Sequence, residues 1–217
     1  MICGFDEAGR GALAGPVCAA AVILSPDFPI EVLGDSKKLS PLQREKAAGL
    51  IYQQAPAWGI GWASAAEIDA LNILRASLLA MERAYDALLC FDAQGLAQRP
   101  DLEGIADGSH TPRVSCNCRA LVKADASVPE VMAASILAKT ARDRMMVRYS
   151  WLYPEYGYAK HKGYPTLEHR ERLERRGPSP IQRTTFTVKG SRAGEAPRDP
   201  GTGRKNALSN GENEAKR

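Results

Sequence analysis

Two short apolar runs lie near the N-terminus, ICGF at 2–5 and VCAAAVIL at 17–24, and the segment DEAGRG at 6–11 separates them. Apolar runs of this length, rich in small or β-branched residues and bounded by Gly or Pro, are typical of buried strands. The glycines of the intervening segment favour a turn. We therefore predict two strands joined by a glycine-rich turn, with Asp6 and Glu7 at the end of the first strand.

Further apolar runs predict strands at 58–63, at 102–107 and between 114 and 123. Helix starts are indicated by serines followed three residues later by Gln or Glu, because the two side chains then satisfy free backbone amides at the helix end. The serines with this pattern are Ser40, Ser64 and Ser127. Strands first, followed by alternating helices and strands, indicate an α/β fold: a mixed five-stranded sheet flanked by helices.

Three helices can be described further from the sequence. The helix after Ser64 is predicted to be long and amphipathic, because apolar residues recur at three- and four-residue steps over 68–88. The helix after Ser127 is rich in small residues and could therefore approach a sheet closely. A last helix is predicted over 167–176, with Gly177 ending it.

The chain has 217 residues, of which 44% are hydrophobic and 25% charged, a composition typical of a globular domain with a sizeable core. We predict a core over 1–150 and a small helical C-terminal region over 151–189. Residues 190–217 contain too few apolar side chains to offset the entropy of ordering them, so we predict a disordered tail.

Composition also excludes several classes of protein. No apolar run approaches the ~20 residues of a membrane helix, and the N-terminal segment does not resemble a secretory signal. Five cysteines without a regular spacing fit a reducing compartment, so we expect a cytoplasmic protein that does not bind membranes. The net charge of +4 is compatible with a nucleic-acid partner but is weak evidence alone. A monomer is the default expectation.

Carboxylates follow several of the predicted strands. Asp6 and Glu7 end the first strand, Asp107 ends the fourth, and Asp125 lies between the fifth strand and a helix. Carboxylates that converge repel one another unless cations are bound, and oxygen-only ligation selects hard ions such as Mg²⁺ or Mn²⁺. Each of these acids alone could equally be a turn former or a helix cap. Adjacent strand residues also face opposite sides, so Asp6 and Glu7 can share a site only where the strand bends or ends.

The segment Gly9-Arg10-Gly11 follows these acids directly. Glycines allow the backbone to approach a ligand closely, so the segment could present amide donors beside a cation. The alternative is an ordinary hairpin turn with a solvated arginine.

The sequence resembles a known family, bacterial type 2 ribonuclease H, which is also called ribonuclease HII. The resemblance extends in order along residues 2–189. The motifs that carry it are DEAGRG at 6–11, GPV at 15–17, DSKKL at 35–39, DG at 107–108, KAD at 123–125, AASILAK at 133–139, RD at 142–143, HKGYPT at 161–166 and SPI at 179–181.

The resemblance implies a ribonuclease H-like fold with a small helical C-terminal region, and an endonuclease that uses two divalent ions, Mg²⁺ or Mn²⁺. The family's four metal-binding and catalytic carboxylates would be Asp6, Glu7, Asp107 and Asp125. One ion would activate the attacking water and the other would stabilise the leaving 3′-oxygen. Substrates would be RNA–DNA hybrids and duplex DNA with single embedded ribonucleotides, cut on the 5′ side of the ribonucleotide to leave 3′-hydroxyl and 5′-phosphate ends.

The resemblance also implies how substrate is recognised. The backbone of Gly9, Arg10 and Gly11, together with Tyr164, would sense the ribose 2′-hydroxyl and the deoxyribose that follows it. The 2′-hydroxyl is the group that marks RNA at a given position, and an aromatic ring can pack on a sugar that lacks it. Binding without sequence preference requires phosphate contacts, although each candidate lysine could also be an ordinary surface charge. These candidates are Lys37, Lys38, Lys139, Lys160 and Lys162.

Two alternatives stay open beside this interpretation. The sister family, ribonuclease HIII, lacks the Gly-Arg-Gly element and usually carries an added N-terminal domain. A non-catalytic nucleic-acid-binding module on the same fold would have no reason to keep all four carboxylates.

Several positions depart from the family pattern or need separate interpretation. Gln182 stands where histidine is expected, which leaves the role of this position open. His110, His161 and His169 are interpreted as surface or substrate-side polar residues rather than metal ligands. The tail has no motif of the kind that binds sliding clamps.

Overall fold

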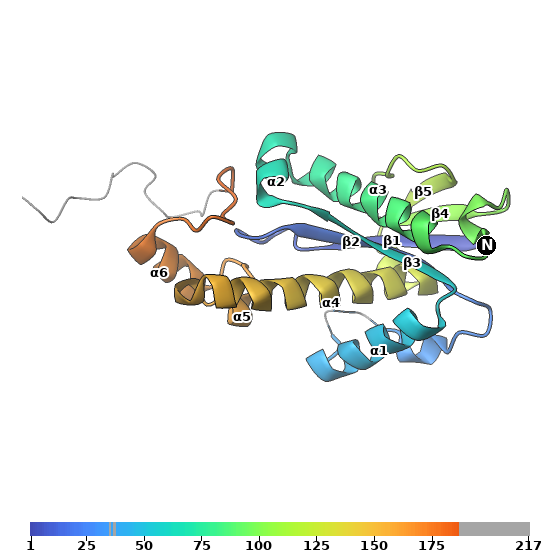
Figure 1. Ribbon diagram of the computed structural model, residues 1–217, viewed down its shortest axis with the longest axis horizontal. Helices are drawn as coiled ribbons and strands as arrows, with labels where there is room; N and C mark the ends of the chain where they lie inside the picture. The colour runs from blue at the N-terminus through green and yellow to red at the C-terminus, as the bar shows by residue number, and fades with distance from the viewer. Residues whose placement is uncertain (35, 37, 187–217) are drawn as a thin grey trace, which may run out of the picture. The chain divides into compact units, whose positions relative to one another are not determined.

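The computed structural model describes residues 1–186 except 35 and 37. Lys37, predicted to contact phosphate, and the predicted tail over 190–217 therefore lie outside the described residues. The strands form one sheet in the order β3-β2-β1-β4-β5 (Figure 1). Their bounds are β1 Ile2–Ala8, β2 Val17–Ile23, β3 Ala57–Ala63, β4 Glu103–Asp107 and β5 Asn117–Leu121.

The sheet is mixed, as predicted. β1 pairs with β2, and β2 with β3, in antiparallel fashion, whereas β1–β4 and β4–β5 are parallel. A hairpin connection suffices for the antiparallel pairs, but each parallel pair requires a longer crossover. The connection that leads to β4 contains helices, whereas residues 108–116 join β4 to β5 without one. The strand order places β1 in the centre of the sheet.

Helices cover both faces of this sheet, with α3 on one face and α4 on the other, and α1 packs outside α4 (Figure 1). Within the described residues, the bounds are α1 Pro41–Gln54, α2 Ala65–Leu71, α3 Ile73–Phe91, α4 Pro129–Leu152, α5 Tyr158–His161 and α6 Leu167–Arg176. Short 3₁₀ turns are η1 Ile30–Val32, η2 Leu96–Gln98, η3 Ala124–Ala126 and η4 Pro154–Tyr156. None of the described helices is long and apolar enough to cross a membrane.

Small residues allow the two covering helices to lie directly against the sheet. A Cβ atom on Gly4 of β1 would lie 2.2 Å from the backbone carbon of Glu130 in α4, and one on Gly61 of β3 would lie 2.1 Å from the carbonyl oxygen of Ala80 in α3. Alanines in the first half of α4 are buried on the same side. The predicted close approach of the small-residue helix is therefore confirmed.

Two of the three predicted capping serines act as expected. Ser40 and Ser64 each accept a hydrogen bond from the amide three residues on, and Gln43 and Glu67 bind back to the serine amides. Helix α6 also has the predicted bounds, with Gly177 after its last turn.

The expectation of one long helix after Ser64 is wrong, because the chain breaks at Asn72. Asn72 has a φ of 72° and separates α2 from α3. Its side chain accepts a hydrogen bond from the amide of Arg75 and so caps α3. With a φ of 72° and a ψ of 163°, Asn72 lies outside the helical region, so the backbone breaks there although the apolar period continues across it.

The expectation that Ser127 caps a helix is also wrong. Its amide donates to the carbonyl of Ala124, so Ser127 closes the turn η3 instead. Helix α4 begins two residues later with Pro129 at its first position and Val128 as a cap without a side-chain bond. Proline suits that position because the helix has no acceptor for its missing amide hydrogen.

The first strand is longer than predicted. β1 continues through both acids to Ala8, because β2 pairs with it along that whole length, with Asp6 opposite Ala20 and Glu7 opposite Ala19. The two acids therefore lie inside a strand rather than after its end.

Residues 1–186 form one compact unit. Helix α4 runs across the boundary predicted at residue 150, and side chains of the C-terminal region pack on its second half, including Tyr156 and Tyr158 beside Met146. The division into a core over 1–150 and a C-terminal region over 151–189 remains a prediction.

Candidate functional site

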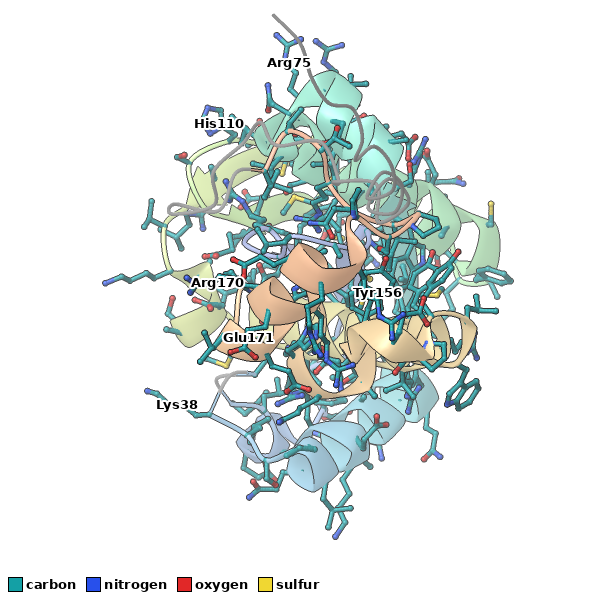
Figure 2. The ribbon with its side chains drawn as sticks, turned by 90° about the vertical axis from the view of Figure 1, so that its left-hand side faces the viewer. Lys38, Arg75, His110, Tyr156, Arg170 and Glu171 are labelled. Atoms are coloured by element: carbon teal, nitrogen blue, oxygen red, sulfur yellow. The ribbon has the colours of Figure 1, made fainter. Side chains whose placement is uncertain are left out.

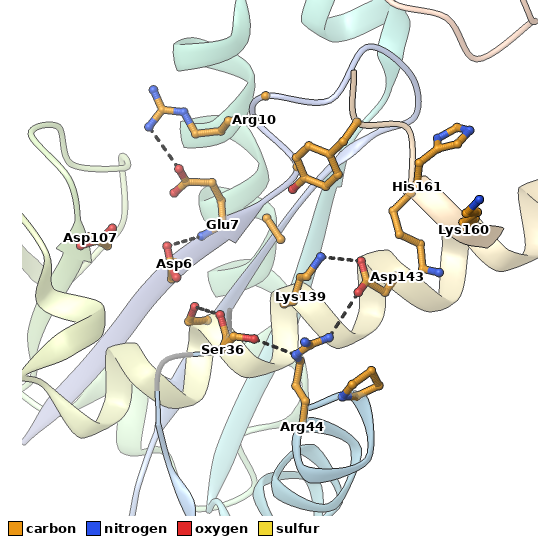
Figure 3. Close-up of a pocket in the computed structure, with 17 residues that line it drawn as sticks. Asp6, Glu7, Arg10, Ser36, Arg44, Asp107, Lys139, Asp143, Lys160 and His161 are labelled. Atoms are coloured by element: carbon orange, nitrogen blue, oxygen red, sulfur yellow. Dashed lines mark hydrogen bonds and ion pairs between the residues drawn. The ribbon is translucent and has the colours of Figure 1, made fainter. Parts of the chain in front are cut away.

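The end of β1 forms an open edge of the sheet. β4 pairs with β1 only as far as Phe5, which lies opposite Ala106, so residues 6–8 have a paired neighbour on the β2 side alone. A pocket of about 730 Å³ lies at this edge (Figure 3). Its lining residues come from β1 and the turn after it, from α1 and the loop before it, from β4, from α4 and from the C-terminal region: Asp6, Glu7, Ala8, Gly9, Arg10, Gly11, Ser36, Pro41, Arg44, Asp107, Ser135, Lys139, Asp143, Lys160, His161, Lys162 and Tyr164.

The open edge allows two acids on opposite faces to share one pocket. Asp6 lies opposite Ala20, which packs with α4, whereas Glu7 lies opposite Ala19, which packs with α3. Residues directly opposite in a pair share a face, so the two carboxylates leave the strand on different sides. Because β4 does not pair with β1 beyond Phe5, both carboxylates reach the pocket although the strand neither bends nor ends between them.

Asp6 is the buried member of this group, with 5% of its surface exposed. Its Oδ1 accepts the amide of Glu7 at 2.7 Å. Burial, together with the negative charges of Glu7 and Asp107, raises the pKa of Asp6 well above its usual range. This carboxyl is therefore destabilised in its charged form unless a positive charge is brought beside it.

The other two lining carboxylates from β1 and β4, Glu7 and Asp107, have polar partners. Glu7 accepts a hydrogen bond from the Arg10 guanidinium at 3.1 Å. Asp107 accepts the amide of Ala124 at 2.8 Å, which fixes the turn η3 against the end of β4. Asp125 is the next residue in that turn and is half-buried, but it is not among the lining residues. The structure thus brings three of the four predicted carboxylates to one pocket, and the assignment of all four as metal ligands remains a prediction.

The donor chemistry of this group fits a hard divalent cation. All the candidate ligand atoms are carboxylate oxygens, and burial and the neighbouring acids disfavour the charged form of Asp6 and raise its pKa. Among the described residues, no three His, Cys, Asp or Glu side chains stand in a ready-made arrangement for a metal ion. The charge and chemistry of the acids therefore support metal binding, and their side chains would have to adjust to hold an ion.

The turn after β1 contributes two glycines to the pocket lining, on either side of the Arg10 whose side chain donates to Glu7. Gly9 has a φ of +100°, a conformation that favours glycine, and a Cβ there would lie 2.0 Å from Nε of Arg142. A Cβ on Gly11 would meet nothing within 4 Å. Gly9 is thus required because Arg142 packs against it, whereas Gly11 has open space beside it.

A group of charged side chains lies on the other side of the pocket (Figure 3). Asp143 of α4 pairs with Lys139 at 2.9 Å and with Arg44 of α1 at 3.3 Å. Arg44 also donates to the carbonyls of Ser36 and Leu39. The sequence analysis did not assign roles to Arg44 or Asp143, although the pair Arg142-Asp143 belongs to one of the motifs quoted above.

Tyr164 also lines the pocket, and its ring lies beside two cations. The Lys139 ammonium is 5.5 Å and the Arg142 guanidinium 5.4 Å from the ring centre. The Tyr164 amide donates to the carbonyl of His161, and its carbonyl lies 3.0 Å from Nδ1 of His169.

The lysines predicted to contact phosphate divide into two groups. Lys139, Lys160 and Lys162 line the pocket. Lys38 is exposed in the loop before α1 and is not among the lining residues (Figure 2).

The interpretation of two histidines as surface residues is wrong. His169 is fully buried and His161 is 7% exposed, and their rings stack with centres 4.3 Å apart. His161 nevertheless lines the pocket, so the substrate-side alternative remains for that residue. His110 is exposed, as predicted. The sequence around His161 and His169 does not indicate that they are buried, because the burial comes from stacking between rings that are eight positions apart.

A sequence profile for ribonuclease HII matches residues 3–189 of the chain. This chain belongs to the ribonuclease HII family. Among curated relatives, a ribonuclease HII of Treponema denticola is 57% identical over 199 residues, which are 87% of this chain and 99% of the relative. A ribonuclease HII of Bordetella pertussis is 50% identical over 186 residues, 86% of this chain and 88% of the relative. The family resemblance seen in the sequence is confirmed.

Solved structures agree with the ribonuclease H-like fold. The ribonuclease H2 of Pyrococcus horikoshii OT3 has a TM-score of 0.61 at 24% identity, covering 85% of this chain and 93% of that one. A ribonuclease HII of Archaeoglobus fulgidus, solved in complex with PCNA, has a TM-score of 0.63 at 25% identity. The match covers 85% of this chain and 92% of that one. A ribonuclease HIII, solved in complex with Mn²⁺, has a TM-score of 0.62 at 21% identity.

Membership of the ribonuclease HII family supports a ribonuclease H endonuclease activity for this chain. The match to the ribonuclease HII profile and to curated ribonuclease HII relatives at 50–57% identity decides between the sister families. The presence of three carboxylates in one pocket weakens the case for a non-catalytic module on the same fold.

Proposed function

We propose that this ribonuclease HII hydrolyses the RNA strand of RNA–DNA hybrids and cuts duplex DNA on the 5′ side of single embedded ribonucleotides. The products would carry 3′-hydroxyl and 5′-phosphate ends. The observation that carries this proposal is one pocket lined both by carboxylates, from β1 and β4, and by the Gly9–Gly11 backbone and Tyr164.

We further propose that Asp6, Glu7 and Asp107, with Asp125 as a fourth ligand, hold two divalent cations, Mg²⁺ or Mn²⁺. The raised pKa of Asp6 and the oxygen-only donor set support this proposal. Bound cations would lower the pKa of an attacking water and stabilise the negative charge of a leaving 3′-oxygen.

The chain's own residues supply positioning and charge. Lys139 and Lys162, on the far side of the pocket from the carboxylates, can contact phosphates and so bind a duplex without reading its sequence. Amides of the Gly9–Gly11 segment can donate to a 2′-hydroxyl oxygen, and this contact places the ribonucleotide beside the carboxylates. The flat ring of Tyr164 can pack on the next sugar when it lacks a 2′-hydroxyl.

The decisive experiment uses a labelled DNA duplex that contains one ribonucleotide. We expect a cut at the 5′ side of that ribonucleotide with Mg²⁺ or Mn²⁺ present, and no cut after addition of EDTA. The product ends are identified by sensitivity to phosphatase and by extension of the 3′ end with a polymerase. A matched all-DNA duplex serves as the substrate control. A cut that persists in EDTA, or a cut at the 3′ side, would overturn the proposal.

A further inference from the structure

Two arginine side chains lie fully inside the protein behind the turn that lines the pocket. Arg142 of α4 is 0% exposed and Arg183, in the segment after α6, is 1% exposed. Within the described residues neither guanidinium forms an ion pair, and the hydrogen bonds of both go to backbone carbonyls. Burying a charge is unfavourable unless its hydrogen bonds are made, so the carbonyls that these arginines bind are held firmly in place.

Arg183 binds both ends of the turn. Its Nη2 and Nη1 donate to the carbonyls of Gly9 and Arg10 at 2.8 and 3.0 Å, and its Nε donates to that of Gly15 at 2.9 Å. Its own amide donates to the carbonyl of Leu13 at 2.9 Å. One side chain thus sets the path of the whole turn.

These bonds also fix where the amides of the turn point. In a trans peptide the C=O of one residue and the N–H of the next point in opposite directions. The carbonyls of Gly9 and Arg10 point back to Arg183, so the amides of Arg10 and Gly11 point away from it. Both residues line the pocket, and neither amide donates a hydrogen bond within the part of the chain that the structure describes.

Arg142 joins this turn to the segment that carries Tyr164. It donates to the carbonyls of Pro16 and Ala14 at 2.9 and 3.1 Å, and to that of Lys162 at 2.9 Å. Its guanidinium also lies 5.4 Å from the centre of the Tyr164 ring. The turn and the tyrosine come from opposite ends of the sequence, and Arg142 contacts both.

We propose that Arg142 and Arg183 are positioning residues for recognition of the ribonucleotide: Arg183 aims the amides of Arg10 and Gly11 into the pocket, and Arg142 holds Tyr164 in register with them. The inference rests on the proposed function of the pocket. Lysine cannot replace either residue, because one ammonium group lacks the planar fork that reaches three separate carbonyls.

The test compares Arg183→Lys and Arg142→Lys with wild type on two duplexes, one with a single ribonucleotide and one with four in a row. For Arg183→Lys we expect kcat to fall at least tenfold on both duplexes while KM stays within twofold, because the phosphate contacts are unchanged. For Arg142→Lys we expect the ratio of kcat/KM on the single ribonucleotide to that on the tract to fall at least fivefold.

Tyr85→Phe is the matched control. Tyr85 is equally buried and its hydroxyl bonds to the Ala97 carbonyl, but it lies on the α3 face outside the pocket. Rates are normalised to the folded fraction measured by circular dichroism. If the two arginines contributed to stability alone, the kcat of both variants, and their ratio of kcat/KM on the single ribonucleotide to that on the tract, would equal those of Tyr85→Phe. That result would overturn the inference.

A second measurement does not depend on activity. In amide-resolved NMR spectra, Arg183→Lys is expected to shift the Arg10 and Gly11 amide signals and to leave that of Phe5 in β1 unchanged. Unchanged Arg10 and Gly11 signals would overturn the positioning role. Failure of wild type to cut either duplex would overturn the proposed function instead, so the two outcomes are distinguishable.

Discussion

Asp6, Arg142 and Arg183 are ionisable residues held almost entirely out of solvent. The two arginines are compensated by carbonyl oxygens, whereas the pKa of Asp6 is raised by burial and by its acidic neighbours. The hydrogen bonds of the arginines hold the backbone of the turn in place. A positive charge beside Asp6 would stabilise its charged form. A rigid turn thus stands beside an electrostatically strained acid at one end of β1.

The first prediction concerns Asp107. Asparagine keeps an oxygen that can accept the Ala124 amide but loses the negative charge, so Asp107→Asn is expected to fold normally. Cleavage should fall at least ~100-fold, the scale of losing one preorganised electrostatic group. Single-turnover rates in Mg²⁺ and thermal melts measure both effects. Asp101→Asn, which alters an exposed acid paired with Arg99, is the control and should cut normally. Normal kinetics for Asp107→Asn would show that the residue is not part of the catalytic group.

The second prediction concerns Tyr164. Tyr164→Ala removes the ring that we expect to pack on the sugar after the ribonucleotide, so the enzyme should lose its preference for the RNA–DNA junction. Tyr164→Phe keeps the ring and should retain that preference. The measurement is the distribution of cuts along a strand with four ribonucleotides followed by DNA. If Tyr164→Ala still cuts as wild type does at a single embedded ribonucleotide, the sensing role is wrong.

The third prediction concerns pH and His169. Burial, with a further contribution from His161, lowers the pKa of His169 from 6.5 to about 4. Its Nδ1 lies by the Tyr164 carbonyl, and its Nε2 has no hydrogen-bond partner among the described residues, so a second proton would lie on an unpaired buried nitrogen. The unfolded chain therefore binds more protons than the native protein between these values, and stability is lost as pH falls from about 6.5 to about 4. A shift of this size corresponds to about 3 kcal/mol.

Urea unfolding at several pH values measures this loss. His169→Asn keeps a donor that can reach the Tyr164 carbonyl but does not titrate, so the decrease in stability between pH 6.5 and 4 should be smaller in the variant. Equal pH slopes in the two proteins would mean that His169 is not the titrating group.

At the level of elements, the sequence predicted what local signals determine. The strands, the helix starts at Ser40 and Ser64 and the end of α6 depend on residues within a few positions of each other. The break at Asn72 and the continuation of β1 through Asp6 and Glu7 could not be predicted in the same way. The continuation of β1 depends on a separate strand, since β2 holds β1 in register beyond the acids. The break at Asn72 is local, but the apolar period that continues across it hides the break in the sequence.

The same distinction applies to the site. The carboxylates and the Gly9–Gly11 segment stand out in the sequence because their residue types cluster locally. The roles of Arg142 and Arg183 do not stand out, because their hydrogen bonds join residues separated by more than a hundred positions. Sequence reasoning therefore found the groups that face the pocket but not the groups behind them.

The fourth prediction belongs to the junction between α2 and the segment that carries Arg183. The Asp69 carboxylate accepts hydrogen bonds from the amides and hydroxyls of Thr184 and Thr185. Burial opposes the charge, but these bonds lower the pKa of Asp69 to about 2. Asp69→Ala is expected to reduce the free energy of unfolding by about 2 kcal/mol, because it leaves several donors without their charged acceptor.

Urea titration measures this change, with Asp27→Ala, an exposed acid in the turn after β2, as the control. Because Arg183 directly precedes Thr184 in the segment that Asp69 binds, Asp69→Ala should also reduce kcat. A stable Asp69→Ala variant with normal kcat would show that the segment keeps its place without this anchor.

At the scale of the whole molecule, the fold places opposite charges on the two sides of one pocket. The carboxylates stand at the ends of β1 and β4, and the lysines come from α4 and the C-terminal region. In the proposed function, the lysine side would attract the duplex backbone and the scissile phosphate would approach the acids. Binding should therefore depend on salt, because each phosphate contact releases counterions.

The fifth prediction follows from this arrangement. Lys139→Met removes one candidate phosphate contact while keeping most of the side-chain volume, and Asp143 retains Arg44 as a partner. The slope of log Kd against log salt concentration should become shallower by about one, since one fewer counterion is released on binding. Fluorescence anisotropy with a labelled hybrid in EDTA, over a series of NaCl concentrations, measures this slope in the absence of cleavage. Lys46→Met on α1 removes an exposed charge outside the pocket and should leave the slope unchanged. Equal slopes for wild type and Lys139→Met would place the duplex elsewhere on the molecule, because a cation that contacts a phosphate cannot be removed without changing the number of ions released.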